Sequence, residues 1–500
     1  MQKLIKNGKK LLAAAAALAC APAFAQLDKA LTVASANTLE EMGTLKTKTS
    51  KQVGASRIGI GFECLDREVF DPSKVYDKIG ATGVKHARCQ TGWARTEKQK
   101  GVYDFKWLDD VVDNLRARGI QPWFNVGYGN PLYMGKTDNP TAVGHVPLYY
   151  GEECLRAWKN YVRALAEHFK GRVFEYEIWN EPNIKKFWQP RAADAAEYAK
   201  FIEITAKEIK AADPDAKIGA CKAGGFDAYF KKFMQNDAAR ELDFFSVHPY
   251  CMVPELGYDA MIAGMRTLIA ASGGKMKIRQ GEAGYPAHIP PDSWVAKGSW
   301  YPSNEDIQAK WMLRRFVADL SNDLEMSSFF MVIDFNSNYK VGGGGAYDEA
   351  VWGIMENGGD YRTRKAYDVL KNFCALFDAR AKPADYYIDL YFGNVFPPKA
   401  KISRLTEVAA SAACKSFDLD GWPLYAYYIP EDLQMRMNPI ENVSLRWASD
   451  APKPIKKPVL IDMMTGKVYK MKKGWQGVPI TDYPLFVTDE DAVADSMAKK

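Results

Sequence analysis

The sequence is poor in the residues that build metal centres and cofactor sites. Five histidines and eight cysteines occur among 500 residues, and no Cys-x-x-Cys pair or His/Cys cluster has the spacing of metal ligands. No glycine-rich phosphate loop opens the first helical segment. The sequence therefore predicts a function that requires no cofactor and no metal.

Net charge of one sign is also small. The chain has 67 Lys and Arg against 61 Asp and Glu, a formal charge of +6, and residues 1–25 hold four lysines and no acid, which leaves +2 for the remainder. This balance is not typical of a nucleic-acid binder. After residue 25 no stretch approaches about 18 consecutive apolar residues, so we expect no transmembrane segment.

The first 25 residues have the pattern of a secretory signal peptide. Four lysines precede an apolar run from Leu11 to Ala19, and Ala23-Phe24-Ala25 resembles a cleavage site. Cys20 raises lipid attachment as an alternative, but the residues before it fit a lipidation motif poorly. We expect residues 1–25 to be removed and the mature protein to be periplasmic or secreted, without a lipid anchor.

Seven cysteines follow the expected cleavage site, an odd number that leaves at least one thiol without an intramolecular partner. Export permits disulfides without requiring them. In the fold proposed below, Cys64 and Cys89 lie near the ends of neighbouring strands, as do Cys221 and Cys251, so these are the pairs to test. Ordinary buried thiols are the simpler expectation for most of them.

Short apolar runs alternate with longer amphipathic segments from residue 57 to residue 377, and the alternation repeats eight times. Helical spacing is clear at 107–115 and 192–212, and Gly119 and Gly171 stand where left-handed helix caps are expected. Eight such units favour an α/β fold of the (β/α)8 TIM-barrel type over a doubly wound sheet. The expected strands are Arg57–Phe62, Val84–Arg88, Gln121–Val126, Val173–Trp179, Lys217–Ala220, Phe244–Val247, Lys277–Gln280 and Ser328–Asp334.

After about residue 380 the texture changes to proline-rich, β-prone segments that predict a small β-sandwich. Met464-Thr465-Gly466 has the composition of a hairpin turn. The predicted organisation is a signal peptide (1–25), an N-terminal arm or linker (26–55), a (β/α)8 barrel (56–379) and a β-sandwich accessory domain (380–500). The expected accessory strands are Tyr386–Phe392, Pro423–Ile429, Val443–Trp447, Val459–Met463 and Pro484–Thr488.

The stretch from Glu175 to Asn183 joins an alternating strand to an abrupt Asn-Glu-Pro stop. Pro182 has no N–H for a strand ladder, so Glu181 would stand at the C-terminal mouth of the fourth strand, where barrel enzymes carry their chemistry. Glu175 and Glu177 share its parity, but Glu177 would lie roughly 13 Å deeper at about 3.3 Å per residue, which makes both of them interior polar residues. The alternative is that Asn-Glu-Pro simply begins a helix.

Polar and aromatic residues follow most of the other expected strands. A second carboxylate, Glu282, ends the seventh strand between two glycines that allow a ligand to approach closely. Two opposed carboxylates predict glycoside hydrolysis, which is retaining at a carboxyl separation of about 5 to 5.5 Å and inverting at about 6.5 to 9.5 Å. The candidate binding residues at the strand ends are Glu63, Arg88, Trp93, Tyr128, Asn130, Trp179, Asn180, His248 and Tyr250.

The chain resembles a known group of enzymes at these positions. Trp179-Asn180-Glu181-Pro182-Asn183, Glu282 and Ser246-Val247-His248-Pro249-Tyr250 are similar to clan A glycoside hydrolases, (β/α)8 enzymes whose acid/base and nucleophile end strands four and seven. Gly101-Val102-Tyr103-Asp104-Phe105 and Tyr128-Gly129-Asn130-Pro131 are similar to family 39-like members, which include β-xylosidases. The resemblance spans about residues 57–377 and is more specific for the clan than for the family.

The resemblance implies a retaining β-glycosidase in which Glu181 is the general acid/base and Glu282 the nucleophile. Asn180 would bind the sugar 2-hydroxyl. Tyr250 would contact the nucleophile, and Arg88 would help keep it ionised.

The surroundings of these residues add further expectations and alternatives. An apolar wall of Trp179 is expected to hold Glu181 protonated. The eighth strand ends without the tryptophan of many clan members, so sugar stacking would pass to Phe335, Trp352 or Trp93. The simpler interpretations are a structural ion pair for Arg88, a supporting role for His248, and ordinary packing for Trp93 and Trp179.

Two classes of function follow. The first is an exported retaining β-glycosidase acting on β-linked oligo- or polysaccharides, with exo and endo action both open because loops 131–150 and 283–301 either close a pocket or wall a groove. The second is a catalytically silent carbohydrate-binding barrel. The presence of both carboxylates favours the enzyme, and the sequence sets neither the sugar nor the oligomeric state.

Overall fold

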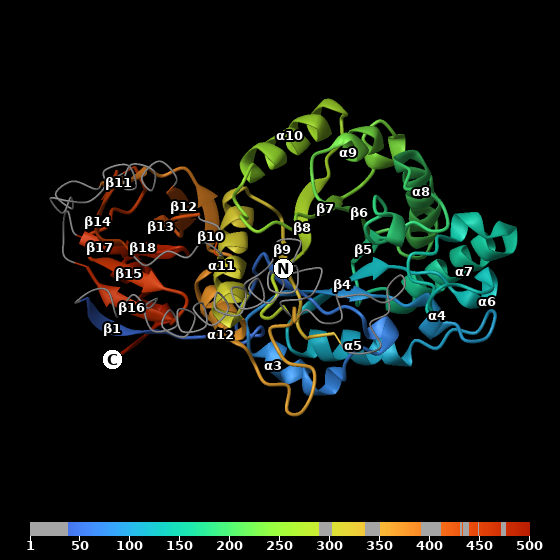
Figure 1. The fold of residues 1–500 in the computed structure, drawn as a ribbon, viewed down its shortest axis with the longest axis horizontal. Coiled ribbons are helices and arrows are strands. Elements are labelled where there is room, and N and C mark those ends of the chain that lie inside the picture. Colours follow the sequence, from blue (N-terminus) through green and yellow to red (C-terminus); the bar gives the residue numbers. More distant parts are fainter. Residues whose placement is uncertain are drawn as a thin grey trace, which may run out of the picture.

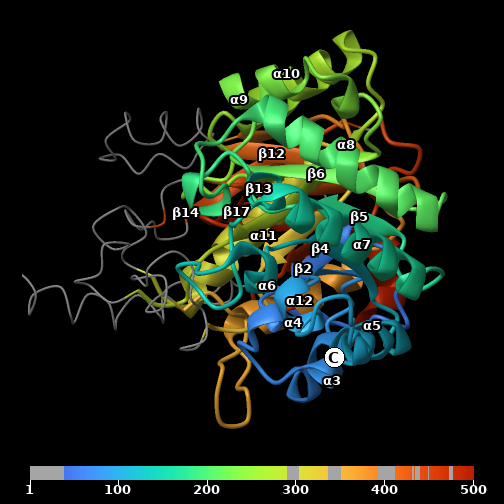
Figure 2. The same ribbon diagram turned by 90° about the vertical axis from the view of Figure 1, so that its right-hand side faces the viewer.

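The computed structural model describes residues 39–289, 303–335, 351–391, 412–430, 433, 440–448, 450–471 and 477–500. A barrel surrounded by helices lies beside a group of strands from the C-terminal part of the chain, coloured orange to red in Figure 1, and Figure 2 shows the barrel side of the same molecule. The predicted signal peptide, residues 1–25, lies outside the described residues. No helix in the described part of the chain is long and apolar enough to cross a membrane.

Eight parallel strands close the predicted barrel. Each strand pairs in parallel with the next, and the last, β9, pairs with the first, β2. Every expected strand is present, although β9 is shorter than the expected 328–334. The strands are β2 (Ile58–Gly61), β3 (His86–Gln90), β4 (Gln121–Val126), β5 (Glu175–Ile178), β6 (Lys217–Ala223), β7 (Phe244–His248), β8 (Lys277–Gly284) and β9 (Ser327–Phe330).

Helices surround the barrel strands, and several bury one face, although α11 (Glu305–Ser321) is buried all round from Ile307 to Leu320. In α5 (Lys106–Ala117) the buried residues are Leu108, Val111, Val112 and Leu115, which form one stripe at three- and four-residue spacing. The expected caps Gly119 and Gly171 have φ of 80° and 76°. The other helices are α3 (Tyr76–Gly80), α4 (Trp93–Thr96), α6 (Pro131–Met134), α7 (Gly151–Phe169), α8 (Ala195–Ala212), α9 (Ala228–Phe233), α10 (Tyr258–Ala271), α11 (Glu305–Ser321), α12 (Lys365–Leu376) and α14 (Glu490–Val493).

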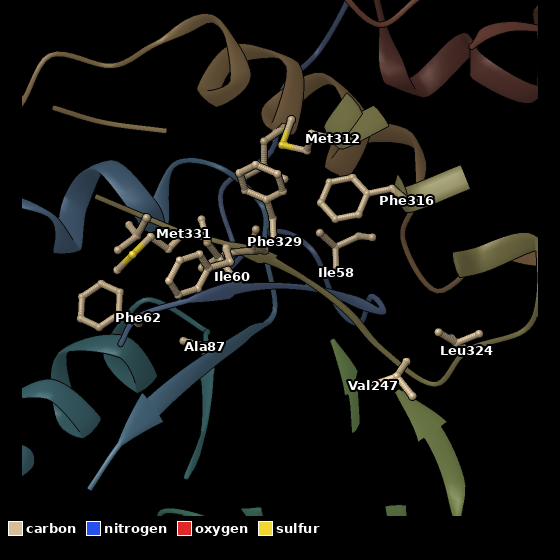
Figure 3. Packing of buried hydrophobic residues seen from close by; sticks show 14 of the residues in the cluster. Ile58, Ile60, Phe62, Ala87, Val247, Met312, Phe316, Leu324, Phe329 and Met331 are labelled. Carbon is tan, nitrogen blue, oxygen red and sulfur yellow. The ribbon is translucent and has the colours of Figure 1, made fainter. Parts of the chain in front are cut away.

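The apolar core lies between the outer faces of the strands and these helices. Figure 3 shows Ile58 of β2 and Phe329 of β9 beside Met312 and Phe316 of α11, all of them buried. Glycines alternate with Ile58 and Ile60 on β2, and they face the opposite side because successive residues of a strand point to opposite faces. A Cβ on Gly61 would stand 3.2 Å from a carboxylate oxygen of Glu63, so this glycine leaves room for the polar residues described below.

The C-terminal strands form two antiparallel sheets, consistent with the predicted β-sandwich. One has the order β10-β12-β13-β18-β15-β16-β1-β19 and the other the order β11-β14-β17. The expected hairpin turn at Met464-Thr465-Gly466 joins two of the strands, with Asp462 opposite Lys467. The strands are β1 (Glu40–Leu45), β10 (Ala381–Ala384), β11 (Ile388–Tyr391), β12 (Ala413–Leu419), β13 (Trp422–Tyr428), β14 (Ile440–Trp447), β15 (Pro458–Asp462), β16 (Lys467–Lys470), β17 (Gly477–Ile480), β18 (Leu485–Asp489) and β19 (Met497–Lys499).

The sequence did not reveal six of these strands, among them β1. β1 comes from the segment predicted as an arm or linker, and it lies between β16 and β19 in the larger sheet. Its sequence, Glu-Glu-Met-Gly-Thr-Leu, has no strand-like alternation, so only the long-range pairing defines it.

The sheets pack against the barrel through α11 and the residues near it. Lys310 of α11 forms an ion pair with Asp482 at 2.9 Å, and both side chains are buried. Glu255 joins the two parts as well, since it accepts hydrogen bonds from Arg314 at 2.7 Å and from the hydroxyl of Tyr428 at 2.8 Å.

The candidate disulfides are not formed. All seven cysteines in the described residues are free thiols. Cys64 Sγ instead accepts a hydrogen bond from Arg67 at 2.9 Å, and Cys221 Sγ contacts two backbone groups of the loop that follows β5.

Candidate active site

Glu181 stands directly after β5, in an unusual backbone turn. Trp179 and Glu181 both have left-handed backbone, with φ of 68° and 44°, so the chain turns sharply at the strand end. The Glu181 side chain is largely buried, with 10% of its surface exposed. Its Oε1 lies 2.9 Å from Nδ1 of His248, which ends β7. The predicted acid is therefore held at the C-terminal mouth of the barrel and does not begin a helix.

Glu282 lies in β8 on the same face of the barrel. Its two carboxylate oxygens have different partners: Oε2 accepts a hydrogen bond from Nη1 of Arg88 at 2.7 Å, and Oε1 accepts one from the hydroxyl of Tyr250 at 2.8 Å. Oε2 also lies 3.7 Å from Nδ1 of His248. Arg88 and Tyr250 thus hold the two oxygens of the candidate nucleophile in place.

The two carboxylates face one another across a short gap. One oxygen of Glu181, one of Glu282 and a ring nitrogen of His248 all lie within 4.8 Å of one another. Retaining glycosidases hold their carboxyl groups about 5 to 5.5 Å apart, whereas inverting enzymes need about 6.5 to 9.5 Å to seat a water molecule. The separation fits direct attack on the sugar by one of the two carboxylates.

Arg88 is the centre of the polar network beneath the pair. Its guanidinium is fully buried and donates to Glu63 at 3.0 Å, to Glu177 through Nε at 3.0 Å and to Oδ1 of Asn180 at 2.8 Å, in addition to Glu282. Asn180 thus has its amide oxygen fixed by Arg88. This orientation leaves the amide N–H groups of Asn180 to act as hydrogen-bond donors.

Burial and neighbouring charges shift the pKa values of two groups in this network. Burial alone would lower the pKa of His248, but the charge of Glu282 and the hydrogen bond with Glu181 outweigh it, so the pKa of the imidazole is raised. Burial raises the pKa of Glu63 to about 8, with Arg88 opposing and the like charge of Glu282 adding to the shift. Glu63 and His248 therefore retain their protons more strongly than the isolated side chains would.

Glu175 and Glu177 are interior polar residues as predicted, but Glu177 does not lie roughly 13 Å below the site, because it shares Arg88 with Glu282. Glu175 accepts two hydrogen bonds from Arg279, both of 2.8 Å. Glu177 is fully buried and accepts from Arg88 and from Asn125. Both acids are paired with arginine inside the barrel, and a carboxylate oxygen of Glu177 also lies within 4.8 Å of a ring nitrogen of His248.

The candidate binding residues Trp93 and Trp179 belong to the aromatic core. Both are fully buried, and their indole N–H groups donate to Glu97 and to the carbonyl of Phe187 respectively. The ring of Trp179 packs on Trp158 and Phe201. The Glu181 carboxylate is hydrogen-bonded to His248, and the expected apolar wall of Trp179 stays a prediction.

Asn130 and Tyr128 support the loop after β4. Asn130 caps α6, accepting from the N–H of Leu132 at 3.0 Å and donating to the carbonyl of Glu97 at 2.9 Å. The hydroxyl of Tyr128 accepts from Gln90 at 3.3 Å, and its ring stacks on Phe187. Both residues are almost fully buried, which fits a structural role for Asn130 in particular.

Trp352 borders the site through Tyr250. The two rings meet edge to face at 6.1 Å between centroids, and Phe330 at the end of β9 lies 6.4 Å from each of them. Phe335 in turn lies 5.9 Å from Phe330. These aromatic residues lie together beside the end of β9.

Sequence reasoning missed the residues that hold the loop from Trp179 to Asn183. Asn125 donates to the carbonyl of Trp179, Cys221 contacts the N–H of Glu181, and Tyr198 donates to the carbonyl of Ile178 just before the loop. Asn125 and Cys221 lie in strands β4 and β6. An asparagine or cysteine within a largely apolar strand was the only sign in the sequence that these residues have a special role. Their partners follow from the strand register and were not readable from the sequence.

Among the residues that the structure describes, two sets of side chains have the composition of metal ligands. Glu181, His248 and Glu282 form one, and Glu177, Cys221 and His248 form the other. Arg88 donates to both Glu177 and Glu282, so a cation at either place would meet its positive charge. We therefore assign these groups to hydrogen bonding and proton transfer.

The barrel and its pair of carboxylates have the architecture of clan A glycoside hydrolases, and comparison with known proteins agrees. Residues 74–272 match the model of glycosyl hydrolases family 39. A β-xylosidase of Geobacillus stearothermophilus is 30% identical over 220 residues, which cover 40% of this chain and 42% of that protein. The chain thus aligns with less than half the length of this curated relative.

Solved structures share the fold over most of the chain. A family 39 glycoside hydrolase from the gut symbiont Bacteroides cellulosilyticus WH2 superposes with a TM-score of 0.61 and 16% identity, covering 87% of this chain and 80% of that one. For a family 39 β-xylosidase from Caulobacter crescentus the TM-score is 0.56 at 16% identity, with 88% and 97% covered. The predicted resemblance to family 39-like members of clan A, and the predicted barrel, are confirmed.

Proposed function

We propose that the protein is a retaining β-glycosidase. The observation that carries this proposal is the gap between Glu181 and Glu282, whose nearest ligand atoms lie within 4.8 Å and which end the fourth and seventh strands of the barrel. The family match over residues 74–272 supports the same activity.

In the first step Glu282 attacks the anomeric carbon while Glu181 donates its proton to the leaving oxygen. Arg88 and Tyr250 hold both oxygens of Glu282 in place and stabilise its charge before the attack. The products are a covalent glycosyl-enzyme and a free alcohol or sugar. His248, 2.9 Å from Glu181, is placed to stabilise the carboxylate that remains after the proton has left.

In the second step Glu181 acts as a base. It removes a proton from water, the water oxygen attacks the anomeric carbon, and the bond to Glu282 breaks. Both inversions together retain the β configuration. Asn180, with its amide N–H groups directed away from Arg88, is the candidate donor to the sugar 2-hydroxyl.

β-Linked xylosides are the substrates we would test first, because the relatives include β-xylosidases. Exo or endo action depends on the loops around the cleft, and part of the 283–301 loop lies outside the described residues. We also propose export, which rests on the signal-peptide pattern of residues 1–25. N-terminal sequencing of the mature protein from the periplasm or the medium tests it: export requires a start near Gln26.

The test of the activity is a panel of aryl β-glycosides and of xylan, glucan and galactan oligosaccharides, measured with wild type, Glu181→Ala and Glu282→Ala. We expect turnover of at least one β-glycoside, loss in both variants, and a β-glycosyl azide when azide is added to Glu181→Ala. An α-configured azide product, or loss in neither variant, would contradict the retaining assignment. Oligosaccharide binding without turnover in the wild type would favour the silent binding protein.

A further inference from the structure

The loop that carries Glu181 is fastened to the neighbouring strand β6 and not only to its own. Besides Asn125 of β4, which donates to the carbonyl of Trp179, three residues outside the loop make contacts with it: Cys221 and Ala223 of β6, and Tyr198 of α8. Their partners are the backbone of Ile178, Trp179 and Glu181 and the side chain of Asn183.

Cys221 makes the central contact. Its thiol donates to the carbonyl of Trp179 at 3.3 Å and accepts from the N–H of Glu181 at 3.4 Å. One sulfur thus satisfies backbone groups on both sides of Asn180. Burial raises the pKa of the Cys221 thiol, so the sulfur keeps the proton with which it donates.

Tyr198 and Asn183 fasten the two ends of the same loop. The hydroxyl of Tyr198 donates to the carbonyl of Ile178 at 2.6 Å and accepts from the N–H of Cys221 at 3.0 Å. Asn183 binds Ala223 twice, accepting from its N–H at 2.9 Å and donating to its carbonyl at 3.0 Å. The loop is therefore held at its start, at Glu181 and at its end.

The backbone of the loop explains why it needs this support. Trp179 and Glu181 are non-glycine residues with left-handed φ, which is unfavourable for side chains with a Cβ, and Pro182 removes one N–H from the turn. Such a conformation persists only where neighbouring groups determine it. A small relaxation would move the Glu181 carboxyl relative to Glu282, and proton transfer depends steeply on such placement.

We propose that Cys221 is a positioning residue for Glu181, which fixes the backbone of the acid/base so that its proton reaches the leaving oxygen. This inference rests on the proposed function, because it assumes that Glu181 is the acid. The contacts of Tyr198 and Asn183 hold the same loop, and together with those of Cys221 we call them the clamp. Its consequence is specific: a loosened clamp weakens protonation of the leaving group and spares the attack by Glu282.

The experiment measures kcat/KM on aryl β-glycosides whose phenol leaving groups differ in acidity. The variants are Cys221→Ala, Cys221→Ser and Tyr198→Phe, with Cys154→Ala as control, a buried thiol on α7 for which the structure records no hydrogen bond among the described residues. Glu181→Ala is the reference for complete loss of the acid. Thermal unfolding of each variant verifies the fold.

We expect Cys221→Ala to lower kcat/KM about tenfold for poor leaving groups, the equivalent of one hydrogen bond, and about twofold or less for dinitrophenol, which leaves without a proton. Cys221→Ser, which donates and accepts as the thiol does, should stay within about threefold of wild type. Cys154→Ala should match wild type throughout.

A loss that is equal for all leaving groups, or no loss at all, would overturn the inference. If Cys221→Ala does not fold, Tyr198→Phe preserves the ring volume and must show the same dependence on the leaving group. The Glu181→Ala variant distinguishes the failure of one proposal from the failure of the other. If Glu181→Ala lacks the dependence, the proposed acid role fails; if Glu181→Ala shows it and the clamp variants do not, only the positioning role fails.

Discussion

Glu63 and Glu282 accept hydrogen bonds from the same nitrogen, Nη1 of Arg88, at 3.0 and 2.7 Å. The candidate nucleophile therefore shares its principal cation with a second carboxyl group, which follows the first barrel strand. Burial raises the pKa of Glu63 to about 8; Arg88 opposes this shift, and the charge of Glu282 adds to it. When Glu63 is protonated, the positive charge of Arg88 is shared by Glu282 and Glu177 alone.

Removing this shared cation should damage both activity and stability. Arg88 donates to four side chains in a fixed planar arrangement that lysine does not reproduce. We expect Arg88→Lys to lower kcat/KM at least about 100-fold and the free energy of unfolding by about 3 kcal/mol, as for broken buried ion pairs. Kinetics and urea unfolding check this. A variant with wild-type kcat/KM would show that Arg88 does not support the nucleophile.

The protonation of Glu63 should make stability fall as pH rises. Its pKa in the folded protein, about 8, exceeds the ordinary 4.5, so the folded state binds more protons than the unfolded state between these values. The free energy of unfolding then decreases with pH across this window. Glu63→Gln, which stays neutral beside Arg88, Glu282 and His248, should flatten the decrease. Urea unfolding of both proteins from pH 5 to pH 8 measures it, and parallel curves would contradict the assignment.

Tyr250→Phe isolates the other contact of the nucleophile. The phenol O–H donates to Glu282 Oε1 at 2.8 Å, and the ring packs against Trp352 and Phe330, contacts that phenylalanine retains. We expect the variant to keep its melting temperature and to lose about 10- to 100-fold in kcat/KM, the effect of one hydrogen bond to a charged group. Equal losses for Tyr250→Phe and for the distant Tyr176→Phe would argue for a general disturbance of the barrel.

The contact between the barrel and the accessory sheets should affect stability without affecting chemistry. Lys310 and Asp482 form a buried pair remote from the carboxylates, so Lys310→Met leaves an unpaired buried acid. We expect a loss of about 3 kcal/mol or more in the free energy of unfolding, with unchanged KM and kcat per folded molecule. The double variant Lys310→Met/Asp482→Leu should recover most of the loss. Failure to recover would show that the pair contributes more than charge compensation.

The sequence predicted the barrel because short strand segments alternate with longer helical ones, and helices such as α5 carry a clear apolar stripe. It also predicted Glu181 and Glu282, since polar residues that end strands meet at one face of a barrel. The accessory strands were harder. β1 and β19 are short and polar, and they are strands only because residues separated by more than 400 positions pair with each other.

The details of the site depend on distances that no spacing encodes. The gap between the carboxylates, the four partners of Arg88 and the two contacts of Cys221 come from the register of neighbouring strands. Trp93 and Trp179 show that a sequence position can be predicted correctly while its role is not. Aromatic residues at strand ends suit sugar stacking and core packing equally well, and burial decides for the core.

The position of β1 has a consequence for how the chain assembles. Because β1 lies between β16 and β19, the whole barrel is inserted in sequence between two adjacent strands of the accessory sheet. β1 is synthesised first, and its partners β16 and β19 are synthesised only when nearly the entire chain is complete. Separating the two parts by cutting near residue 380 would leave β1 on the barrel fragment and open the sheet between β16 and β19, so the accessory sheet is not a detachable module of consecutive residues.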